Sequence, residues 1–200
     1  MPAPEPSLTP TSYLVLGLVR SFPGSTSYDL KAIVAGSIGY FWSFPHSQLY
    51  AEPARLVELG LLDEDREHSG RKRRRYSITD AGVEALDRWL SVPEQGTTEI
   101  RDLGLLQLFF GGAAGPDRVR ALAAVQIAAH ESRLAEYTEI ADRAASDRGA
   151  PEHQAGDTHM FATLAMGLRF ERAALTFWRD VEAGADELAQ GRLAAMGFPA

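Results

Sequence analysis

The sequence contains no cysteine, and this absence removes several classes of function at once. Without thiols the chain has no disulfide framework, no thiolate metal site and no cysteine nucleophile. It also lacks a basic N-terminal region followed by an apolar core, so we expect no secretory signal. The longest apolar stretches, such as residues 13–19, are too short to span a bilayer. These absences predict a protein of the reducing cytoplasm that makes no use of a membrane.

Enzyme and metal motifs are missing as well. There is no Walker loop, GxGxxG fingerprint or nucleophile elbow, and the glycine-rich stretch 111–115 (GGAAG) follows no predicted strand. His153 and His159 stand six residues apart, and His130 is adjacent to Glu131, so neither pair has the spacing of metal ligands. The sequence therefore predicts no catalytic residues, no metal site and no cofactor.

Charge is unevenly distributed along the chain. The formal net charge of −7 argues against indiscriminate binding of nucleic acid. Residues 1–92 hold 10 Lys and Arg against 11 Asp and Glu, whereas residues 93–200 hold 10 against 16. Half of the basic residues of the first segment form one run at 71–75 (RKRRR). Local charge is therefore a better guide to function than the whole-chain balance.

The first half of the chain predicts three helices, two strands and a further helix. Residues 1–8 are rich in proline and predict a disordered tail, and Thr9 followed by Pro10 is typical of a helix start. The remaining elements are a buried helix through 13–19, helices at about 28–34 and 45–59, strands at 61–67 and 75–79 around a His68-Ser69-Gly70 turn, and a helix after the Thr79-Asp80 cap with Val83, Leu86, Trp89 and Leu90 on its apolar side. This order predicts a winged helix-turn-helix domain over residues 9–92.

The third predicted helix has one polar face of small side chains. At 100° per residue, Leu49, Pro53, Leu56 and Val57 share one side of this helix. The opposite side carries Ser47, Gln48, Ala51, Ala54, Arg55 and Glu58, with Tyr50 on its flank. Small side chains allow a helix to enter a major groove closely, where Gln48 reads adenine and Ser47 bonds a phosphate. The alternative is an ordinary helix surface.

The basic run is the second candidate for contact with DNA. A turn between two strands is the part of a winged helix that touches phosphates or enters a minor groove. Strand alternation places Arg73 and Arg75 on one side and Arg74 and Tyr76 on the other, so the whole run does not contact DNA together. The candidate residues are Arg71, Lys72, Arg73, Arg74 and Arg75. The alternative is a solvated hairpin tip.

The second half of the chain predicts helices only. A linker at 93–98 precedes a helical dimerisation and effector domain over 99–200, with helices at about 100–110, 116–148 and 157–188. The last helix carries two apolar stripes, one for the preceding helix and one, most simply, for a second subunit. The candidate dimerisation residues are Leu164, Leu168, Phe170, Leu175, Phe177 and Trp178.

Four aromatic side chains leave two interpretations open. Trp42, Trp89, Phe109 and Trp178 are simply core residues on the first. On the second they line a pocket for a small planar aromatic effector, near the junction of the two domains or at the dimer interface. Their spacing favours neither interpretation.

The ordered set of motifs resembles the PadR family of bacterial transcriptional regulators. The resemblance is carried by YLVLGLV (13–19), GSTSYDL (24–30), Trp42, HSQLY (46–50), LVELGLL (56–62), GRKRRRYSIT (70–79), Ala81-Gly82 and Trp89-Leu90. The second half resembles the family's virulence-activator-like helical domain in RDLGLLQLFF (101–110) and GLRFERAALTFW (167–178). The family's Tyr-Pro-x-Leu pattern is replaced here by Tyr50-Ala51-Glu52-Pro53, and Pro53 predicts a kink in the third helix.

This resemblance implies a mainly helical protein: a winged helix-turn-helix domain followed by an all-helical dimerisation domain. It implies that Tyr50 binds a phosphate, that the basic wing contacts double-stranded DNA, and that small aromatic ligands control binding. We therefore expect no enzyme, but a homodimeric repressor on a pseudo-palindromic operator. The alternative is a winged-helix module whose basic wing binds an acidic protein partner.

Overall fold

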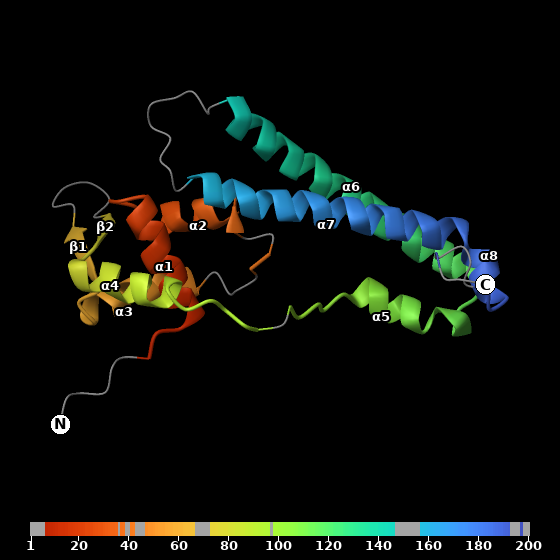
Figure 1. Cartoon of the computed structure of the whole chain (residues 1–200), viewed down its shortest axis with the longest axis horizontal. Helices are drawn as coiled ribbons and strands as arrows, with labels where there is room; N and C mark the ends of the chain where they lie inside the picture. Colours follow the sequence, from red (N-terminus) through yellow and green to blue (C-terminus); the bar gives the residue numbers. More distant parts are fainter. Residues whose placement is uncertain are drawn as a thin grey trace. The chain divides into compact units, whose positions relative to one another are not determined.

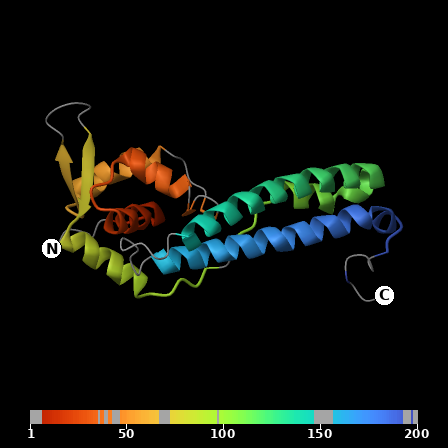
Figure 2. The ribbon, with the colours of Figure 1, turned by 90° about the horizontal axis from the view of Figure 1, so that it is seen from above.

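The chain divides into two compact units, Met1–Gly96 and Thr97–Ala200. The computed structural model describes residues 7–35, 37–38, 41–42, 47–66, 73–96, 98–146, 157–192 and 197. Figures 1 and 2 show the first unit as a group of short helices with a two-stranded sheet, and the second as long helices. Of the tail predicted at 1–8, residues 1–6 lie outside the described residues.

The first helix, α1 (Pro10–Ser21), begins at the predicted cap. The Thr9 side chain accepts a hydrogen bond from the Ser12 amide, while the Ser12 hydroxyl oxygen accepts one from the Thr9 amide at 2.8 Å. This reciprocal capping satisfies two amides that would otherwise have no partner in the helix. Val15, Leu16 and Val19 are completely buried, which confirms that α1 is the central helix of the first unit.

Two further helices pack on α1. They are α2 (Ser27–Ala35) and α3 (Gln48–Glu58). Residues 43–46, where the third helix was predicted to start, lie outside the described residues. α3 continues through Pro53 as one helix, and the proline ring is completely buried in the core. Gly60, at a φ of +70°, follows the end of α3 and lets the chain turn into the sheet.

The sheet consists of two antiparallel strands, β1 (Leu62–Arg66) and β2 (Arg74–Ile78). Leu62 pairs with Ile78 at one end and Arg66 with Arg74 at the other, so the two strands approach the predicted basic turn together. That turn, residues 67–72, lies outside the described residues. The fourth helix, α4 (Asp80–Leu90), begins at the predicted Thr79 cap. The element order is therefore that of the predicted winged helix.

A partly buried polar cluster joins α1 to α3. The completely buried Ser12 hydroxyl donates to Glu52 Oε1 at 2.7 Å, and Arg55 donates to the same carboxylate oxygen at 2.7 Å and to Ser12 Oγ at 2.9 Å. Burial by itself would raise the pKa of Glu52, but the hydrogen bonds from Arg55 and Ser12 and the charge of Arg55 outweigh it, so the pKa lies below its usual value.

The second unit contains helices only, among its described residues. They are α5 (Leu103–Phe109), the short 3₁₀ helix η2 (Gly111–Ala113), α6 (Pro116–Ser146), α7 (Asp157–Ala183) and α8 (Ala185–Ala189). The predicted last helix is in fact two, because the chain turns at Gly184 and α8 packs back on α6. α6 and α7 form a long hairpin (Figures 1 and 2).

The core of the hairpin buries several large apolar side chains of α7. Trp178 is 1% exposed and packs with Val119 and Ala123 of α6. Leu164 and Leu175 are also buried within the single chain. Farther along the hairpin, buried His130 of α6 meets buried Glu171 of α7, with 2.5 Å between Nδ1 and Oε2.

The two apolar stripes of α7 therefore differ from the prediction. The first predicted stripe is Leu164, Leu168, Leu175 and Trp178, and the second is Phe170, Ala174, Phe177 and Val181. Both contribute to the core of this chain, since Val181 is as buried as Trp178. Leu168 and Phe177 are half-buried, and Phe170 remains 47% exposed. Further exposed apolar side chains lie on α5, where Leu103, Leu106 and Phe109 are 76, 54 and 82% exposed.

The Glu52 cluster predicts a pH-dependent contribution to stability. Glu52→Gln should lower the free energy of unfolding at neutral pH by about 1–2 kcal/mol, because Arg55 loses its charged acceptor. Since the pKa of Glu52 is lowered by folding, its contribution is present above the unfolded value near 4.5 and is lost as the pH falls through the folded value. Urea unfolding at several pH values measures this difference.

Glu58→Gln, on the exposed end of the same helix, is the matched control. It should leave the unfolding free energy nearly unchanged at every pH. A Glu52→Gln variant as stable as the wild type at neutral pH would show that the cluster contributes nothing.

Candidate nucleic-acid interface

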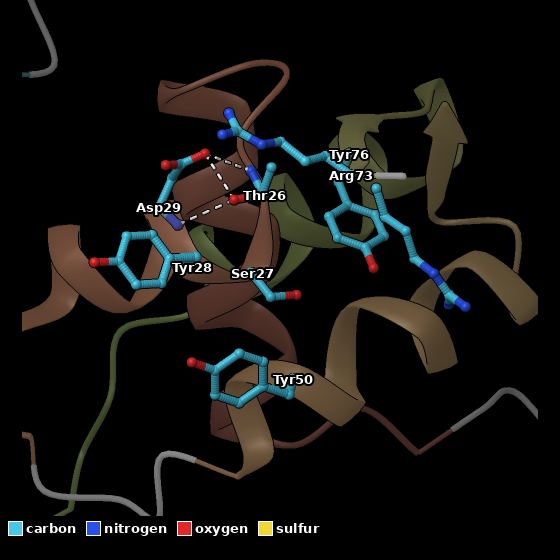
Figure 3. Close-up of a pocket in the computed structure, with 8 residues that line it drawn as sticks. Thr26, Ser27, Tyr28, Asp29, Tyr50, Arg73 and Tyr76 are labelled. Atoms are coloured by element: carbon cyan, nitrogen blue, oxygen red, sulfur yellow. Dashed lines mark hydrogen bonds between the residues drawn. The ribbon is translucent and has the colours of Figure 1, made fainter. Parts of the chain in front are cut away.

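The first unit carries a hollow of about 670 Å³ between the start of α2, the start of α3 and strand β2 (Figure 3). Its lining comes from three elements that are far apart in the sequence. The lining residues are Thr26, Ser27, Tyr28, Asp29, Tyr50, Arg73, Arg74 and Tyr76. Hydroxyl and guanidinium donors predominate among them, with Asp29 the one carboxylate.

The α2 side of the hollow is fixed by a second reciprocal cap. The Thr26 amide and hydroxyl donate to Asp29 Oδ2 at 2.9 and 2.8 Å, and the Asp29 amide donates to Thr26 Oγ1 at 3.2 Å (Figure 3). These bonds from the Thr26 backbone and side chain, together with the charges of Arg75 and Arg73, hold the pKa of Asp29 below its usual value against a small effect of burial. The Asp29 carboxylate is therefore ionised at neutral pH and is attracted by the positive charges of Arg75 and Arg73 in the wing.

The α3 side of the hollow is formed by Tyr50, which is half exposed. Figure 3 shows Tyr50 of α3 and Ser27 and Tyr28 of α2 around the same hollow. Tyr76 of β2 is buried and pairs as an isolated bridge with Ser25, which ties the strand to the start of α2. Exposed phenol and hydroxyl groups beside an arginine are suited to binding phosphate oxygens.

The wing residues that the structure describes have different surroundings. Arg74 forms an ion pair with Glu64 of β1 at 3.4 Å, and Arg75 donates to the Gly24 carbonyl at 3.1 Å. Arg73 is exposed and lines the hollow. Arg71 and Lys72, the other two predicted contacts, lie outside the described residues. The described part of the wing thus places Arg73 and Arg74 at the hollow, and Arg74 and Arg75 are also bonded within their own unit.

The outer face of α3 carries most of its predicted residues at the surface. Ser47, Gln48 and Ala51 are exposed. Arg55 is placed differently from the prediction, because Glu52, one turn away, and Ser12 of α1 hold its guanidinium group. Arg55 therefore positions α3 on α1.

Two groups of residues at this surface were not assigned to it from the sequence. Thr26 and Asp29 form a Thr-x-x-Asp cap that the sequence pattern alone could have indicated. Thr11 of α1 donates a hydrogen bond to Gln48 Oε1 at 3.0 Å. No local pattern indicates this contact, because 37 residues separate the partners.

The four aromatic candidates are divided between the two units. Trp89 was predicted on the apolar side of α4, yet it is 45% exposed and stacks on Tyr13, with ring centroids 4.8 Å apart. Trp42 and Phe109 are exposed as well, whereas Trp178 is a core residue. Among the described residues, no three His, Asp or Glu side chains gather as metal ligands. No described helix combines the length and apolarity needed to cross a membrane.

Comparison with known proteins gives the same division of the chain. The transcriptional regulator PadR-like family matches residues 15–88, and the virulence activator alpha C-terminal domain matches residues 100–184. The negative transcriptional regulator PadR of Bacillus subtilis (strain 168) is 32% identical over 101 residues, which are 49% of this chain and 54% of that protein. The chain therefore spans about half the length of this relative.

Solved structures show the same fold over nearly the whole chain. Bacillus subtilis PadR in complex with operator DNA aligns with a TM-score of 0.73 at 22% identity, covering 88% of this chain and 98% of that one. The same regulator with p-coumaric acid gives a TM-score of 0.67 at 21% identity, with the same coverage. The Vibrio cholerae virulence activator AphA gives 0.63 at 26% identity, covering 89% and 99%.

The described first unit thus has the winged-helix order of elements, and the described second unit contains helices only, as in these regulators. Both sequence matches fall on regulators of transcription, not on enzymes. This chain belongs to the PadR-like family of transcriptional regulators, with a C-terminal domain of the virulence activator alpha type.

Proposed function

We propose that the protein binds operator DNA as a homodimer and represses transcription until a small effector changes its affinity. The observation that carries the proposal is the surface where the exposed face of α3 adjoins the hollow lined by Tyr50 and Arg73. As a bacterial regulator of this kind it would act in the cytoplasm, where its operator is.

The surface has the chemistry that a DNA duplex requires. Ala51 adds little bulk to the exposed face of α3, so the helix can lie deep in a major groove. Tyr50 and Ser47 then offer hydroxyl donors to the phosphates at its edge, and Arg73 brings positive charge from the wing. Bacillus subtilis PadR, a chain of the same fold, has been solved in complex with operator DNA, which supports DNA as the partner.

The exposed apolar surface of α5 supports a dimer. Leu103, Leu106, Phe109 and Phe110 are all more than half exposed in the single chain, on a helix of seven residues and its end. Several exposed apolar side chains on one short helix are typical of an interface with another chain. We assign a second copy as the partner, because two copies present two reading heads to the half-sites of a pseudo-palindrome. Phe170 and Leu168 of α7 are further candidates for the same interface.

The exposed aromatics support an effector site. Trp42 and Trp89 present ring surface on which a planar aromatic compound can stack, as does Phe109 in the second unit, whereas Trp178 is fully used in the core. Bacillus subtilis PadR has been solved with p-coumaric acid, an aromatic acid. The acidic second half of this chain favours a neutral or cationic ligand over an anionic one.

The competing function is a protein-binding module, in which the basic wing meets an acidic partner. A gel shift with the DNA upstream of the protein's own gene, in the presence of random competitor DNA, distinguishes the two. A specific shift supports the regulator. Absence of any shift at low salt, where phosphate contacts are strongest, would favour the protein-binding module.

Of the predictions that follow from the proposed function, the first concerns the wing. Arg73→Ala should weaken binding to operator and random DNA alike, and should lower the slope of log K against log salt by up to about 2 units, since each lost phosphate contributes about 0.9 in each of two subunits. Fluorescence anisotropy at a series of salt concentrations measures the slope. Arg88→Ala on α4, an exposed arginine outside the hollow, is the matched control and should leave the slope unchanged. An unchanged slope for Arg73→Ala would show that Arg73 does not contact a phosphate.

The second prediction concerns assembly. Light scattering on a size-exclusion column at micromolar concentration should give about twice the chain mass of 21.8 kDa. Phe109→Glu should shift the protein towards the monomer, because a charge in an apolar interface has no compensating partner. Gln107→Glu adds the same charge at an exposed polar position of α5 and should leave the dimer intact. A monomeric wild type would remove the basis for palindromic binding.

The third prediction concerns control. Titration with planar aromatic compounds should quench tryptophan fluorescence, more strongly for a neutral analogue than for the anionic p-coumaric acid, and Trp89→Phe or Trp42→Phe should remove part of the response. A true effector must bind with a different affinity when operator is present, because coupling between two ligands is reciprocal. Compounds that quench equally with and without operator are not effectors.

A further inference from the structure

A hydrogen bond fixes the orientation of the Gln48 side chain at the start of α3. Its amide oxygen accepts a hydrogen bond from the hydroxyl of Thr11, in the first turn of α1, with 3.0 Å between Oγ1 and Oε1. Gln48 is exposed on the face of α3 that we assign to the major groove. A neighbouring helix thus holds one end of the side chain that we expect to read a base.

The position of Thr11 is itself fixed. Thr9 and Ser12, on either side of Pro10 and Thr11, form the reciprocal cap of α1. Ser12 is completely buried and bonded to Glu52, which lies one turn after Gln48 on the same side of α3. The first turns of the two helices are therefore held together next to the Thr11–Gln48 contact. Thr11 has no other hydrogen bond to its side chain among those described.

The contact determines which end of the amide is presented. A glutamine amide has one oxygen acceptor and one NH₂ donor group on opposite sides of the same carbon. With the oxygen turned towards Thr11, the NH₂ group is the end left for the groove. A glutamine that pairs with adenine at two points uses both ends of its amide, because adenine presents an N7 acceptor beside an N6 donor. Guanine instead presents two acceptors, N7 and O6.

We propose that Thr11 is a specificity-determining residue, which orients Gln48 as a hydrogen-bond donor and thereby makes it select guanine over adenine. The proposal rests on the proposed function, since it names the base that the same surface reads. It replaces the adenine contact expected from the sequence, where Gln48 was treated as a free side chain. Thr11 acts through Gln48 and need not touch DNA.

The test uses the full-length protein and selection of bound sequences from a pool of random duplex DNA. Wild type, Gln48→Ala, Thr11→Val and Thr11→Ser are compared. The position read by Gln48 is the one at which Gln48→Ala loses its base preference. At this position the wild type should prefer guanine over adenine by about 5-fold or more, the lower end of what one good base contact supplies.

Thr11→Val keeps the shape of the side chain but removes the hydroxyl. It should free the amide oxygen, reduce the guanine preference to near or below unity, and leave the salt dependence of binding unchanged. Thr11→Ser retains the hydroxyl and should keep the wild-type preference. Thermal unfolding of all variants should be similar, because the cap of α1 is made by Thr9 and Ser12. A general loss of affinity without a change in base preference would indicate a merely structural role and overturn the proposal.

Three other outcomes overturn it as well. One is an adenine or cytosine preference in the wild type, because both bases present an amine donor that needs the oxygen of Gln48. Another is the same base preference in Thr11→Val as in the wild type. The third is a Gln48→Ala variant with an unaltered selected sequence. If the wild type enriches no sequence at all, the proposed DNA-binding function itself fails, which is distinguishable from each of these results.

Discussion

The buried hydroxyl of Ser12 is the interaction on which the arrangement of the first unit depends. Its oxygen accepts hydrogen bonds from the Thr9 amide and from Arg55, and its O–H group donates one to Glu52. One small side chain therefore caps α1 and joins it to α3. A hydroxyl with no access to water must have such partners, because an unpaired one would cost about 1–3 kcal/mol. The charged pair on α3 satisfies it, and α3 is thereby held at one rotation about its axis. That rotation decides which residues of α3 are exposed.

Much of this fold could be predicted because its signals are local. Thr9 and Thr79 identify helix starts through bonds within three residues, and the glycine after α3 marks its end through a backbone conformation that glycine adopts easily. The side of α3 occupied by Leu49, Pro53 and Leu56 also followed from helical periodicity alone. The sequence was most informative where the partner of a residue lay within about one turn.

The errors arose where a distant partner decides the outcome. Arg55 was expected to face outward, since nothing near it in sequence shows that Ser12 would help to hold it. Trp89 was predicted on the apolar side of its helix, but it stacks on Tyr13 and remains 45% exposed. The stripes of α7 were assigned to two partners, whereas α8 turns back and completes the core of a single chain. Each error concerns what covers a surface, which periodicity does not report.

The His130–Glu171 pair has a mechanical consequence for the α6–α7 hairpin. In this register the buried Glu171 carboxylate is bonded by His130 and lies 3.6 Å from Arg133 Nε. A shift of one turn would break the contact with His130, and loss of the partner of a buried charge costs several kcal/mol. Sliding of one helix along the other is therefore strongly opposed at this layer. The hairpin can bend or tilt as one rod, but it cannot act as a telescoping element. A conformational change transmitted by the hairpin must accordingly move both helices together.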